Sequence, residues 1–570
     1  MTVIGIDFGT TNSVAAVFER GEVEVLELDD LVPVDWAPYG FARVIPSVFA
    51  VDENSRLTFG WEAKTGTEFR GDRFDAIKRL FASQEDAAFG DSGNSVAVEE
   101  AATLLFAEIQ RRAQTQSGVS ARQAVITVPA NSKGRARHRT KVCAGMGGFE
   151  VLSLINEPTA AAMAYARTHP DARRYLVFDW GGGTLDVTIL EAVDGVFIEQ
   201  ASSGIARSGG LDFDARLSKA ITETAAITGE WDKAQKRQFR LEVERAKIHL
   251  STHETVTLQL PGGGSNTVTR RRFEEIVDPL IQESRIPIER CLQELNVGPG
   301  SIDALVLVGG TSMIPAVRRF VQDIVGTDAD PTVNPMTAIA EGAAIAAAIL
   351  TGENPDNDFF VSTEHALGTF AVDSNTGQLA FSEIIPKSHK LPARATQTYF
   401  PVSEEQTAVN IDVVEGDPAH EDFVVLKDWS VDLLAQDGDR GFDLTYEYDI
   451  SGILTVTAID QESGQVILQD DVAYGIATDK GELAAVAKRA RDAVQSGTVT
   501  KDPAAPTSDL QPASAELIQK AEQLVIPYLD ADSASAIVEL VDQLRTSTAE
   551  AEATCRESLR DALQPYSFLF

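Results

Sequence analysis

The chain has 570 residues, which is too long for one hydrophobic core, because such cores stop growing at about 250–300 residues. Its hydrophobic content of 44% is ordinary for globular domains, and its formal net charge of −37 argues against nucleic acid as a partner. Cys143, Cys291 and Cys555 are too far apart to indicate a disulfide framework or a zinc site. No segment reaches the roughly 20 apolar residues of a membrane span, and no signal core precedes the first strand pattern. We therefore expect a cytoplasmic protein that does not contact a membrane.

Residues 1–352 are predicted to form an α/β domain, because short β-branched runs alternate there with helical patterns. We interpret a basic run at residues 133–141 as a solvated helix face rather than a nucleic-acid patch. The predicted strands are 3–7, 14–18, 125–128, 176–179, 186–190 and 304–308, and the predicted helices are 95–117, 156–167, 212–228, 233–250, 272–295 and 337–350.

The second half of the chain changes character. Residues 353–361 are polar, acidic and turn-rich, which is typical of an interdomain linker. Residues 362–476 alternate apolar and polar positions without intervening helices, which predicts an antiparallel β-sandwich. Residues 477–570 are predicted to be a short α-helical region, with a proline-containing flexible joint at 498–512.

One local plan occurs twice in the first domain, at residues 4–13 and 177–186. Each copy is an apolar strand that ends in aspartate, then a glycine turn with threonine, then a second strand. Glycine lets backbone N–H groups approach a phosphate closely, and threonine hydroxyls add donors. Asp7 and Asp179 would repel a bare triphosphate, so we expect Mg²⁺ between them. The sequence therefore predicts that two facing hairpins bind the terminal phosphates of a nucleotide from both sides.

A third glycine turn follows the predicted strand 304–308. Gly309 and Gly310 open from this strand toward a helix, which is a suitable place for a base and ribose. The sequence contains neither the G-x-x-x-x-G-K-[ST] pattern of a P-loop nor the G-x-S-x-G pattern of a serine hydrolase. The predicted nucleotide site is therefore of another type.

These motifs together resemble the DnaK family of seventy-kilodalton heat-shock chaperones. Residues 4–13, 155–162, 177–186 and 305–315 match its phosphate-one, connecting, phosphate-two and adenosine motifs, and residues 76–80, 125–130, 209–214 and 244–251 match further motifs in the same order. The resemblance implies an actin-like ATPase domain made from a duplicated ribonuclease-H-like unit, followed by a peptide-binding β-sandwich and a helical lid-like region. The chain looks like a divergent bacterial paralogue of the HscC type.

The resemblance also implies roles for individual residues. Lys78, Glu157, Asp186 and Thr184 would be catalytic, acting on the γ-phosphate and the attacking water. Asp7 and Asp179 would hold Mg²⁺ largely through its waters, and K⁺ is a further candidate ion. The expected contacts to ATP or ADP are Gly9, Thr10, Thr11, Asn12, Lys78, Gly181, Gly182, Gly183, Thr184, Gly209, Gly210, Glu244, Lys247, Gly309, Gly310, Thr311 and Ser312.

Two further groups of residues follow from the resemblance. Pro129 and Arg137 would relay the nucleotide state between domains, and Tyr399, Val409 and Ile411 would line the peptide cleft. The residues alone leave simpler alternatives open. A lysine such as Lys78 is often a solvated helix residue, Glu157 stands at a helix start, and alternating valine and isoleucine are most often core.

Several positions depart from the family pattern. Met313 stands where an arginine usually stacks near adenine, and Met336 replaces a usual aspartate. Ser153 replaces a basic residue that contacts J-domain partners, and the linker lacks the aspartate that usually follows its aliphatic run. Extended peptides and a nucleotide-exchange factor are the expected partners, whereas coupling to a standard J-domain co-chaperone is in question.

We therefore predict an ATP-dependent chaperone that binds extended hydrophobic segments of unfolded proteins. The sequence leaves three alternatives open: an actin-like filament protein, a sugar kinase of the same ancestry, and a nucleotide-binding scaffold or regulator with weak ATPase activity. No surplus motif indicates a sugar pocket, and a filament protein has no need for a β-sandwich.

Overall fold

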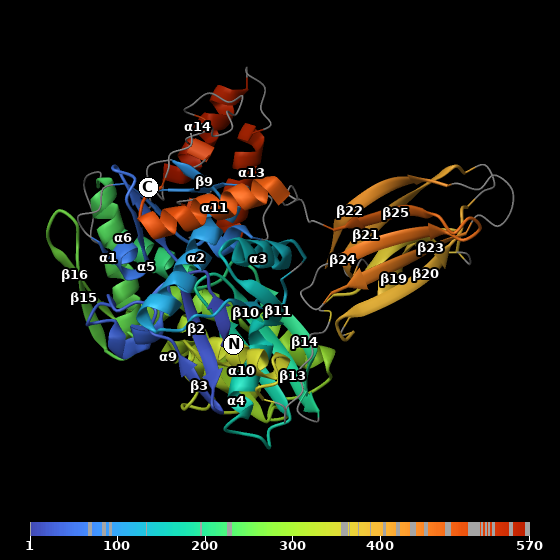
Figure 1. Cartoon of the computed structure of the whole chain (residues 1–570). Helices are drawn as coiled ribbons and strands as arrows, with labels where there is room; N and C mark the ends of the chain where they lie inside the picture. Colours follow the sequence, from blue (N-terminus) through green and yellow to red (C-terminus); the bar gives the residue numbers. More distant parts are fainter. Residues whose placement is uncertain are drawn as a thin grey trace.

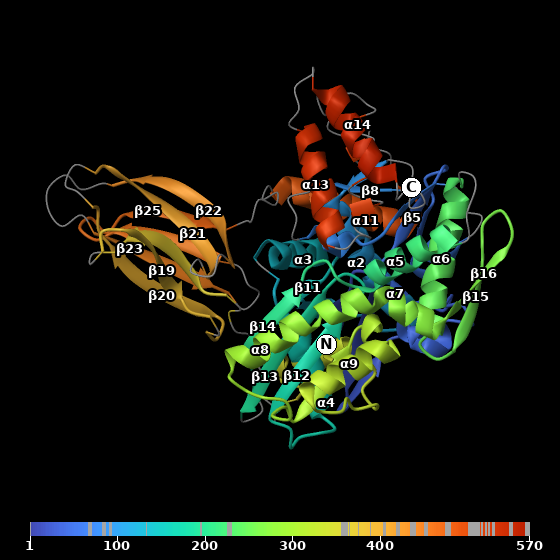
Figure 2. The same cartoon turned by 180° about the vertical axis from the view of Figure 1, so that it is seen from behind.

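The computed structural model shows an α/β body, a β-sandwich beside it and a group of helices on the body (Figures 1 and 2). It describes residues 2–570 except 67–70, 82–86, 91–93, 133, 194–195, 225–230, 355–362, 364, 374–375, 388, 403–405, 418–421, 434–440, 450–453, 473–479, 500–513, 515–516, 519–520, 522–524, 527–530, 546–550 and 565–570. Most of the expected linker 353–361 therefore lies outside the described residues.

The first lobe of the body is built on a six-stranded mixed sheet. Its central strand β1 pairs antiparallel with β2 and parallel with β10, which in turn pairs parallel with β11. The strands, in sheet order, are β11 (Glu150–Asn156), β10 (Gln123–Val128), β1 (Val3–Phe8), β2 (Asn12–Glu19) and β3 (Glu22–Val25), with β4 (Ile45–Pro46) also on β2.

The second lobe repeats this plan in a four-stranded sheet. Strand β12 pairs antiparallel with β13 and parallel with β17, and Asp179 is paired with Asp186 across the hairpin. The two predicted hairpins are thus confirmed as β1–β2 and β12–β13. The strands, in sheet order, are β14 (Val196–Ile205), β13 (Leu185–Val193), β12 (Arg174–Trp180) and β17 (Ala304–Val308).

Helices α4 (Glu157–Ala166) and α10 (Ala338–Leu350) pack against each other and share one buried cluster with residues of both sheets. Alanine-rich sequences allow this close approach, because small side chains let helix backbones come together. The other helices of the body are α1 (Gly60–Thr65), α2 (Val98–Gln116), α3 (Gly134–Met146), α5 (Gly210–Thr224), α6 (Lys233–His249), α7 (Arg270–Glu283), α8 (Arg285–Glu294) and α9 (Pro315–Val325).

Short elements complete the body. The strands are β5 (Phe49–Asp52), β6 (Leu57–Phe59), β7 (Gly71–Phe74), β8 (Ala87–Phe89), β9 (Ser95–Ala97), β15 (Thr255–Gln259) and β16 (Ser265–Thr269). The 3₁₀ helices are η1 (Ala37–Tyr39), η2 (Phe41–Arg43), η3 (Ile77–Leu80) and η4 (Gly310–Met313).

Two predicted helices differ from the structure. The first three residues of the predicted helix 95–117 form strand β9, which pairs with β8. The predicted helix 272–295 is broken at Ser284 into α7 and α8. Pro287 explains the break, because it has no N–H to donate to the carbonyl of Glu283 and disfavours a continuous helix before it.

The β-sandwich consists of two antiparallel four-stranded sheets, as the alternating pattern predicts. Side chains from both sheets, among them Val413, Tyr446 and Val456, form its buried core. One sheet has the order β19 (Leu379–Ile385), β18 (Leu367–Val372), β21 (Ala408–Asp417), β22 (Asp422–Asp432), and the other the order β20 (Ala393–Tyr399), β23 (Phe442–Tyr448), β24 (Leu454–Asp460), β25 (Val466–Asp471).

The C-terminal helices are α11 (Lys480–Ser496), α13 (Ala531–Arg545) and α14 (Glu552–Leu563), and they lie on the α/β body (Figures 1 and 2). Helix α11 packs on α2 and α3, with Ala490 and Val494 in the core of the first lobe. Arg489 forms an ion pair with Glu100 at 3.3 Å. Among the described helices, none is both long and apolar enough to cross a membrane.

The interpretation of the basic run at 133–141 as a solvated face is wrong for its centre. Arg139 is fully buried, forms an ion pair with Glu99 at 2.7 Å and donates to the Leu80 carbonyl. Arg137 is also buried and donates to Asn156 Oδ1 at 3.0 Å. The sequence spacing correctly predicts that these arginines lie on a helix. It does not predict their burial, which depends on partners on other elements.

Helix α3 also touches the sandwich. The backbone N–H of Gly134 donates to Glu415 at 2.8 Å, so a carboxylate from the sandwich satisfies a donor at the start of the helix. Farther along the helix, Lys141 forms an ion pair with Asp449 at 3.3 Å. The described contacts thus link the α/β body to the sandwich through α3.

His138 lies on this helix, and burial lowers its pKa to about 4, with Lys141 adding to the effect and Asp449 and Asp471 opposing it. The folded chain keeps this imidazole neutral, whereas the unfolded chain takes up a proton below about pH 6.5. We therefore predict that the free energy of unfolding falls by about 1–2 kcal/mol between pH 7 and pH 5 because of His138.

Denaturant unfolding of the parent and the His138→Gln variant at both pH values measures this loss. The exposed His389, replaced in the same way, is the matched control. An equal pH slope in the parent and the His138→Gln variant would contradict the assignment.

Candidate functional site

The two hairpin turns meet in a cavity of about 1760 Å³, which opens between the lobes and continues toward the sandwich. The contact between the turns leaves no room for side chains. A Cβ added at Gly182 would lie 2.4 Å from Thr11 Cγ2, and one at Gly183 would lie 2.7 Å from Thr10 Oγ1. Glycine is required here because the backbone of one hairpin passes directly over the threonines of the other.

Lys78 enters this cavity from η3 of the first lobe. Its ammonium group forms an ion pair with Glu157 at 2.5 Å, and its side chain is only 11% exposed. Ala76, just before the 3₁₀ helix, has a φ of 53°, a left-handed conformation that costs an alanine about 1–2 kcal/mol. Lys78 is therefore not a solvated helix lysine, and strained backbone helps to aim it at the cleft.

Glu157 is the first residue of α4 and is buried. It follows Asn156, whose backbone is extended, so the carboxylate leaves the end of β11 toward the cavity. Its partner Lys78 comes from a segment 79 residues away in the sequence. The helix start that the sequence indicated is present, and the side chain is engaged in the ion pair.

Asp7 and Asp179 occupy corresponding places at the ends of β1 and β12. Burial and the nearby Glu157 raise the pKa of Asp7 to about 7, against the opposing effects of Lys78 and the Thr127 hydroxyl. Burial, followed by Glu157 and the other carboxylates, raises the pKa of Asp179 well above its ordinary value. Several acids thus share one buried region, and their mutual repulsion adds to the cost of charging them.

Asp186 adds a further carboxylate from β13. Burial and Glu157 raise its pKa to about 7, while the neighbouring Thr184 hydroxyl and Lys78 lower it only in part. Both of its carboxylate oxygens are buried and accept no hydrogen bond of ordinary geometry among the described residues. These oxygens can therefore accept hydrogen bonds from water or from a ligand in the cavity.

The pKa of Lys78 reflects the same imbalance. Burial acts to lower it, but Glu157 and Asp7 outweigh burial, so that the net shift is upward. One ammonium group therefore faces four carboxylates, those of Asp7, Glu157, Asp179 and Asp186.

A divalent cation fits this oxygen-rich cavity. Carboxylate oxygens suit Mg²⁺, which keeps several of its waters when it binds to proteins. Within the described part of the chain, no three His, Cys, Asp or Glu side chains converge closely enough to ligate a metal directly. The residues present therefore fit an ion held largely through its water shell.

The second lobe supports its hairpin turn from behind. Gly210 N donates to Gly181 O at 3.0 Å, and the Thr311 hydroxyl donates to the same carbonyl at 2.7 Å. Lys247 donates to Gly210 O at 2.9 Å and forms an ion pair with Asp214 at 2.6 Å. These bonds tie the 209–210 turn, α6 and η4 to one hairpin.

A second pocket opens beside the phosphate cavity and shares Thr11, Asn12, Gly182, Gly310 and Met336 with it. This is where a base and ribose would lie if the terminal phosphates lay between the hairpins. Its remaining walls include Glu244, Lys247, Thr311 and Met313, together with Tyr39 and Phe41 of the first lobe. Ser312 lies behind the wall, where its hydroxyl donates to Gly309 O at 2.7 Å.

Contacts across the cleft hold the lobes together. Lys64 of α1 forms an ion pair with Glu244 of α6 at 2.7 Å. Burial acts to raise the pKa of Glu244, but Lys64 and Lys247 outweigh burial and lower it. Glu244 is predictable from its motif, but its partner Lys64 is not, because the two residues are 180 positions apart and share no motif.

Arg79 is a site residue that the sequence analysis missed. Its side chain is 8% exposed, and Nη2 donates to Gly183 O and pairs with Asp212, both at 3.0 Å. It thus reaches from η3 to the turn of the opposite hairpin. Its position directly after Lys78 was the one signal in the sequence that would have found it.

The residues expected to couple the domains and to bind peptide differ from one another in burial. Pro129 lines the large cavity, whereas Arg137 is buried and donates to Asn156. In the sandwich, Tyr399 is half-buried and exchanges a hydrogen bond with Ser382, and Val409 is also half-buried. Ile411 is 1% exposed and lies in the sandwich core, so it offers no surface to a peptide in this conformation.

Comparison with known proteins agrees with these features. A family model described as "Hsp70 protein" matches residues 77–567. "Chaperone protein DnaK" of Prochlorococcus marinus (strain MIT 9515) is 33% identical over 504 residues, which cover 81% of this chain and 77% of that relative. A family match over most of the length, with this level of identity, settles the relationship: the chain belongs to the Hsp70 family.

Proposed function

We propose that this chain hydrolyses ATP in the cleft between its two lobes and uses the nucleotide cycle to control how its sandwich holds extended peptides. As a member of the Hsp70 family, the chain is an ATP-dependent chaperone and an ATPase. The observation that carries the assignment of the site is the buried Lys78–Glu157 pair beside three other carboxylates, beneath two opposed glycine turns.

The chemistry in this site is positioning and charge neutralisation, without a covalent intermediate. Lys78 binds the γ-phosphate, and Glu157 fixes the direction of its ammonium group. Asp186 accepts a hydrogen bond from the attacking water and orients it, which uses the carboxylate oxygens that lack protein donors. Thr184 donates its hydroxyl to the γ-phosphate. The backbone N–H groups of both turns hold the phosphates from opposite sides.

Asp7 and Asp179 would hold Mg²⁺ through its waters, and the ion would neutralise charge on the terminal phosphates. K⁺ is a further candidate for the same oxygen-rich region.

The remaining nucleotide contacts follow the walls of the two pockets. Gly9 to Asn12 and Gly181 to Thr184 hold the phosphates, and Gly209, Gly210 and Gly309 bring backbone close to them. Glu244, Lys247, Gly310 and Thr311 surround the ribose and base, and Ser312 supports this wall.

We assign residues 1–352 to an actin-like ATPase domain, 353–361 to a linker, 362–476 to the peptide-binding sandwich and 477–570 to a helical lid-like region. Pro129 and Arg137 relay the nucleotide state toward α3, which contacts Glu415 of the sandwich. The packing of α11 on the first lobe supports a conformation in which the helical region is withdrawn from the peptide site.

Extended peptides with aliphatic or aromatic side chains are the proposed clients, and Tyr399 and Val409 are the proposed contacts. Ile411 would contact peptide only after the sandwich core rearranges. A nucleotide-exchange factor is a further proposed partner. Ser153 is fully buried in β11, so standard J-domain binding at that residue is not supported. The cytoplasmic location stays a prediction.

The scaffold alternative, a nucleotide-binding protein with weak hydrolysis, is not favoured. A scaffold would need the glycine turns but would gain nothing from a buried lysine–glutamate pair beside an oriented aspartate. Burying these charged groups costs free energy, and a catalytic role explains why the chain nevertheless buries them.

Replacing Lys78 with alanine tests the catalytic assignment. We predict that Lys78→Ala still binds ATP but hydrolyses it at least about 100-fold more slowly, because one preorganised charge at the γ-phosphate is lost. Single-turnover hydrolysis of radiolabelled ATP measures the rate, and Lys219→Ala on the exposed face of α5 is the control. Normal hydrolysis in Lys78→Ala would exclude the proposed role.

Replacing Val409 with aspartate tests the peptide site. We predict that Val409→Asp weakens binding of a fluorescent unfolded hydrophobic peptide more than about tenfold, because a charge would have to be desolvated against an apolar side chain. Fluorescence anisotropy in the presence of ADP measures this affinity. Val466→Asp on β25, where the valine is 54% exposed, is the matched control. Equal peptide affinities of the two variants would show that Val409 does not belong to the peptide site.

A further inference from the structure

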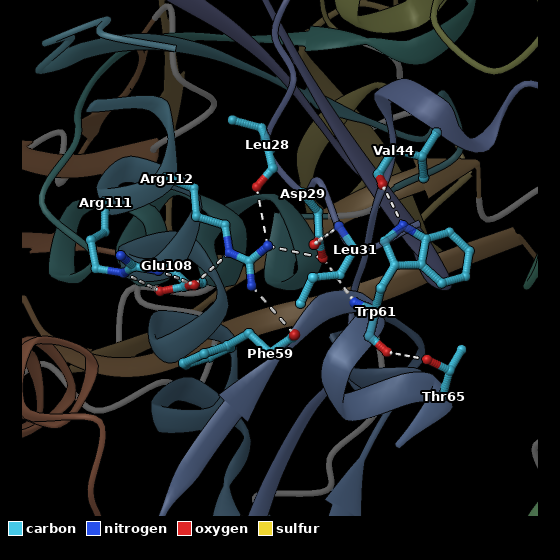
Figure 3. Close-up of polar contacts among 10 residues, drawn as sticks. All are labelled: Leu28, Asp29, Leu31, Val44, Phe59, Trp61, Thr65, Glu108, Arg111 and Arg112. Carbon is cyan, nitrogen blue, oxygen red and sulfur yellow. Dashed lines mark hydrogen bonds and ion pairs between the residues drawn. The ribbon is translucent and has the colours of Figure 1, made fainter. Parts of the chain in front are cut away.

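Residues 31–44, which we call the strap, leave the first lobe and return to it between two anchored ends. Asp29 accepts from Leu31 N at 3.2 Å and from Trp61 N at 2.8 Å, and the Trp61 indole donates to Val44 O at 3.1 Å (Figure 3). Asp29 and Trp61 are fully buried, so both ends of the strap are fixed to one rigid point.

Arg112 of α2 holds that point in place (Figure 3). Its guanidinium pairs with Asp29 at 2.9 Å and with Glu108 at 2.5 Å, and it donates to the carbonyl of Leu28. A buried cation with two carboxylates and several backbone acceptors makes a stiff network, because each lost bond would leave a buried charge exposed to apolar surroundings.

The middle of the strap crosses to the second lobe. The Tyr39 ring lies 5.0 Å from the His249 ring, and its hydroxyl is 3.3 Å from both His253 Nδ1 and Thr252 Oγ1. Asp35 Oδ2 lies 3.9 Å from His249 Nε2. The strap thus contacts the C-terminal end of α6, the helix that carries Glu244 and Lys247.

The same residues form one wall of the pocket beside the phosphate cavity. Tyr39 and Phe41 line it from the strap, and Met313 and Met336 line it from the second lobe. Gly40 has a φ of 90°, and a Cβ there would lie 3.1 Å from Met336 Cγ. The strap therefore touches the opposite wall of the pocket as well as α6.

The inner side of the strap is rigid. Trp36 packs edge-on against Phe41 at 5.4 Å and against Trp61 at 5.2 Å between ring centroids. The Lys64 ammonium lies 5.0 Å from the centroid of the Trp36 ring while it pairs with Glu244. This cation–π contact joins the strap to the ion pair that crosses the cleft.

We propose that Tyr39 and Phe41 of the strap hold the adenine of ATP or ADP against Met313 and Met336, and that the nucleotide leaves only when the strap lifts from α6. This inference rests on the proposed ATP site. Aromatic rings and methionine sulfur bind a flat heterocycle by stacking and dispersion.

The test compares the parent with Tyr39→Ala, Tyr39→Phe and Val34→Ala. Val34 lies on the same strap and is 91% exposed, so it serves as the matched control. Stopped-flow chase of a fluorescent ADP gives the release rate, and competition gives the affinities of ADP and of inorganic pyrophosphate, which has no base.

We expect Tyr39→Ala to release ADP about tenfold faster and to bind it more weakly by the same factor, with unchanged affinity for pyrophosphate. Tyr39→Phe, which keeps the ring, should change the rate by about two- to threefold, and Val34→Ala should match the parent. Melting curves check that every variant is folded.

The outcomes separate this inference from the function on which it rests. A parent chain that binds no ADP would overturn the proposed ATP site and the strap with it. A parent that retains ADP while Tyr39→Ala releases it at the same rate would overturn the strap alone. Loss of pyrophosphate affinity in Tyr39→Ala would show a general effect on the cleft and would also overturn the base contact.

Discussion

The structure depends on a concentration of negative charge that the protein does not neutralise by itself. Asp7, Glu157, Asp179 and Asp186 face the ammonium group of Lys78, and each of the four carboxylates is buried or half-buried. Burial raises the pKa of three of these acids, which means that charging them costs free energy in the ligand-free protein. A divalent cation held near these carboxylates would offset part of this cost.

The site exists because two lobes close on each other. Each lobe supplies one glycine turn, and the pairs Lys64–Glu244 and Arg79–Asp212 cross the cleft between them. A nucleotide between the turns would touch both lobes and favour the closed form by its differential affinity for it. The first lobe also carries α3, which contacts the sandwich through Glu415 and on which α11 packs. The lobe that closes on the nucleotide site is therefore the lobe that contacts the sandwich.

Local patterns in the sequence predicted much of this, and contacts between distant segments account for the rest. The hairpins at Asp7 and Asp179 were predictable because strand, turn and ligand chemistry lie within ten residues of each other. The order of motifs then gave Lys78. The burial of Arg139, the role of Arg79 and the path of residues 31–44 depend on partners far away in the chain, which no periodicity reports. The roles of the predicted site residues stay predictions until a ligand is bound.

The most direct measurement is a crystal structure of the chain with Mg²⁺ and a non-hydrolysable ATP analogue. The account predicts the triphosphate between the turn at Gly182 and Gly183 and the turn at Thr10 and Thr11, with the metal on the side of Asp7 and Asp179. A triphosphate bound away from these turns, or a metal with no carboxylate near its water shell, would contradict it.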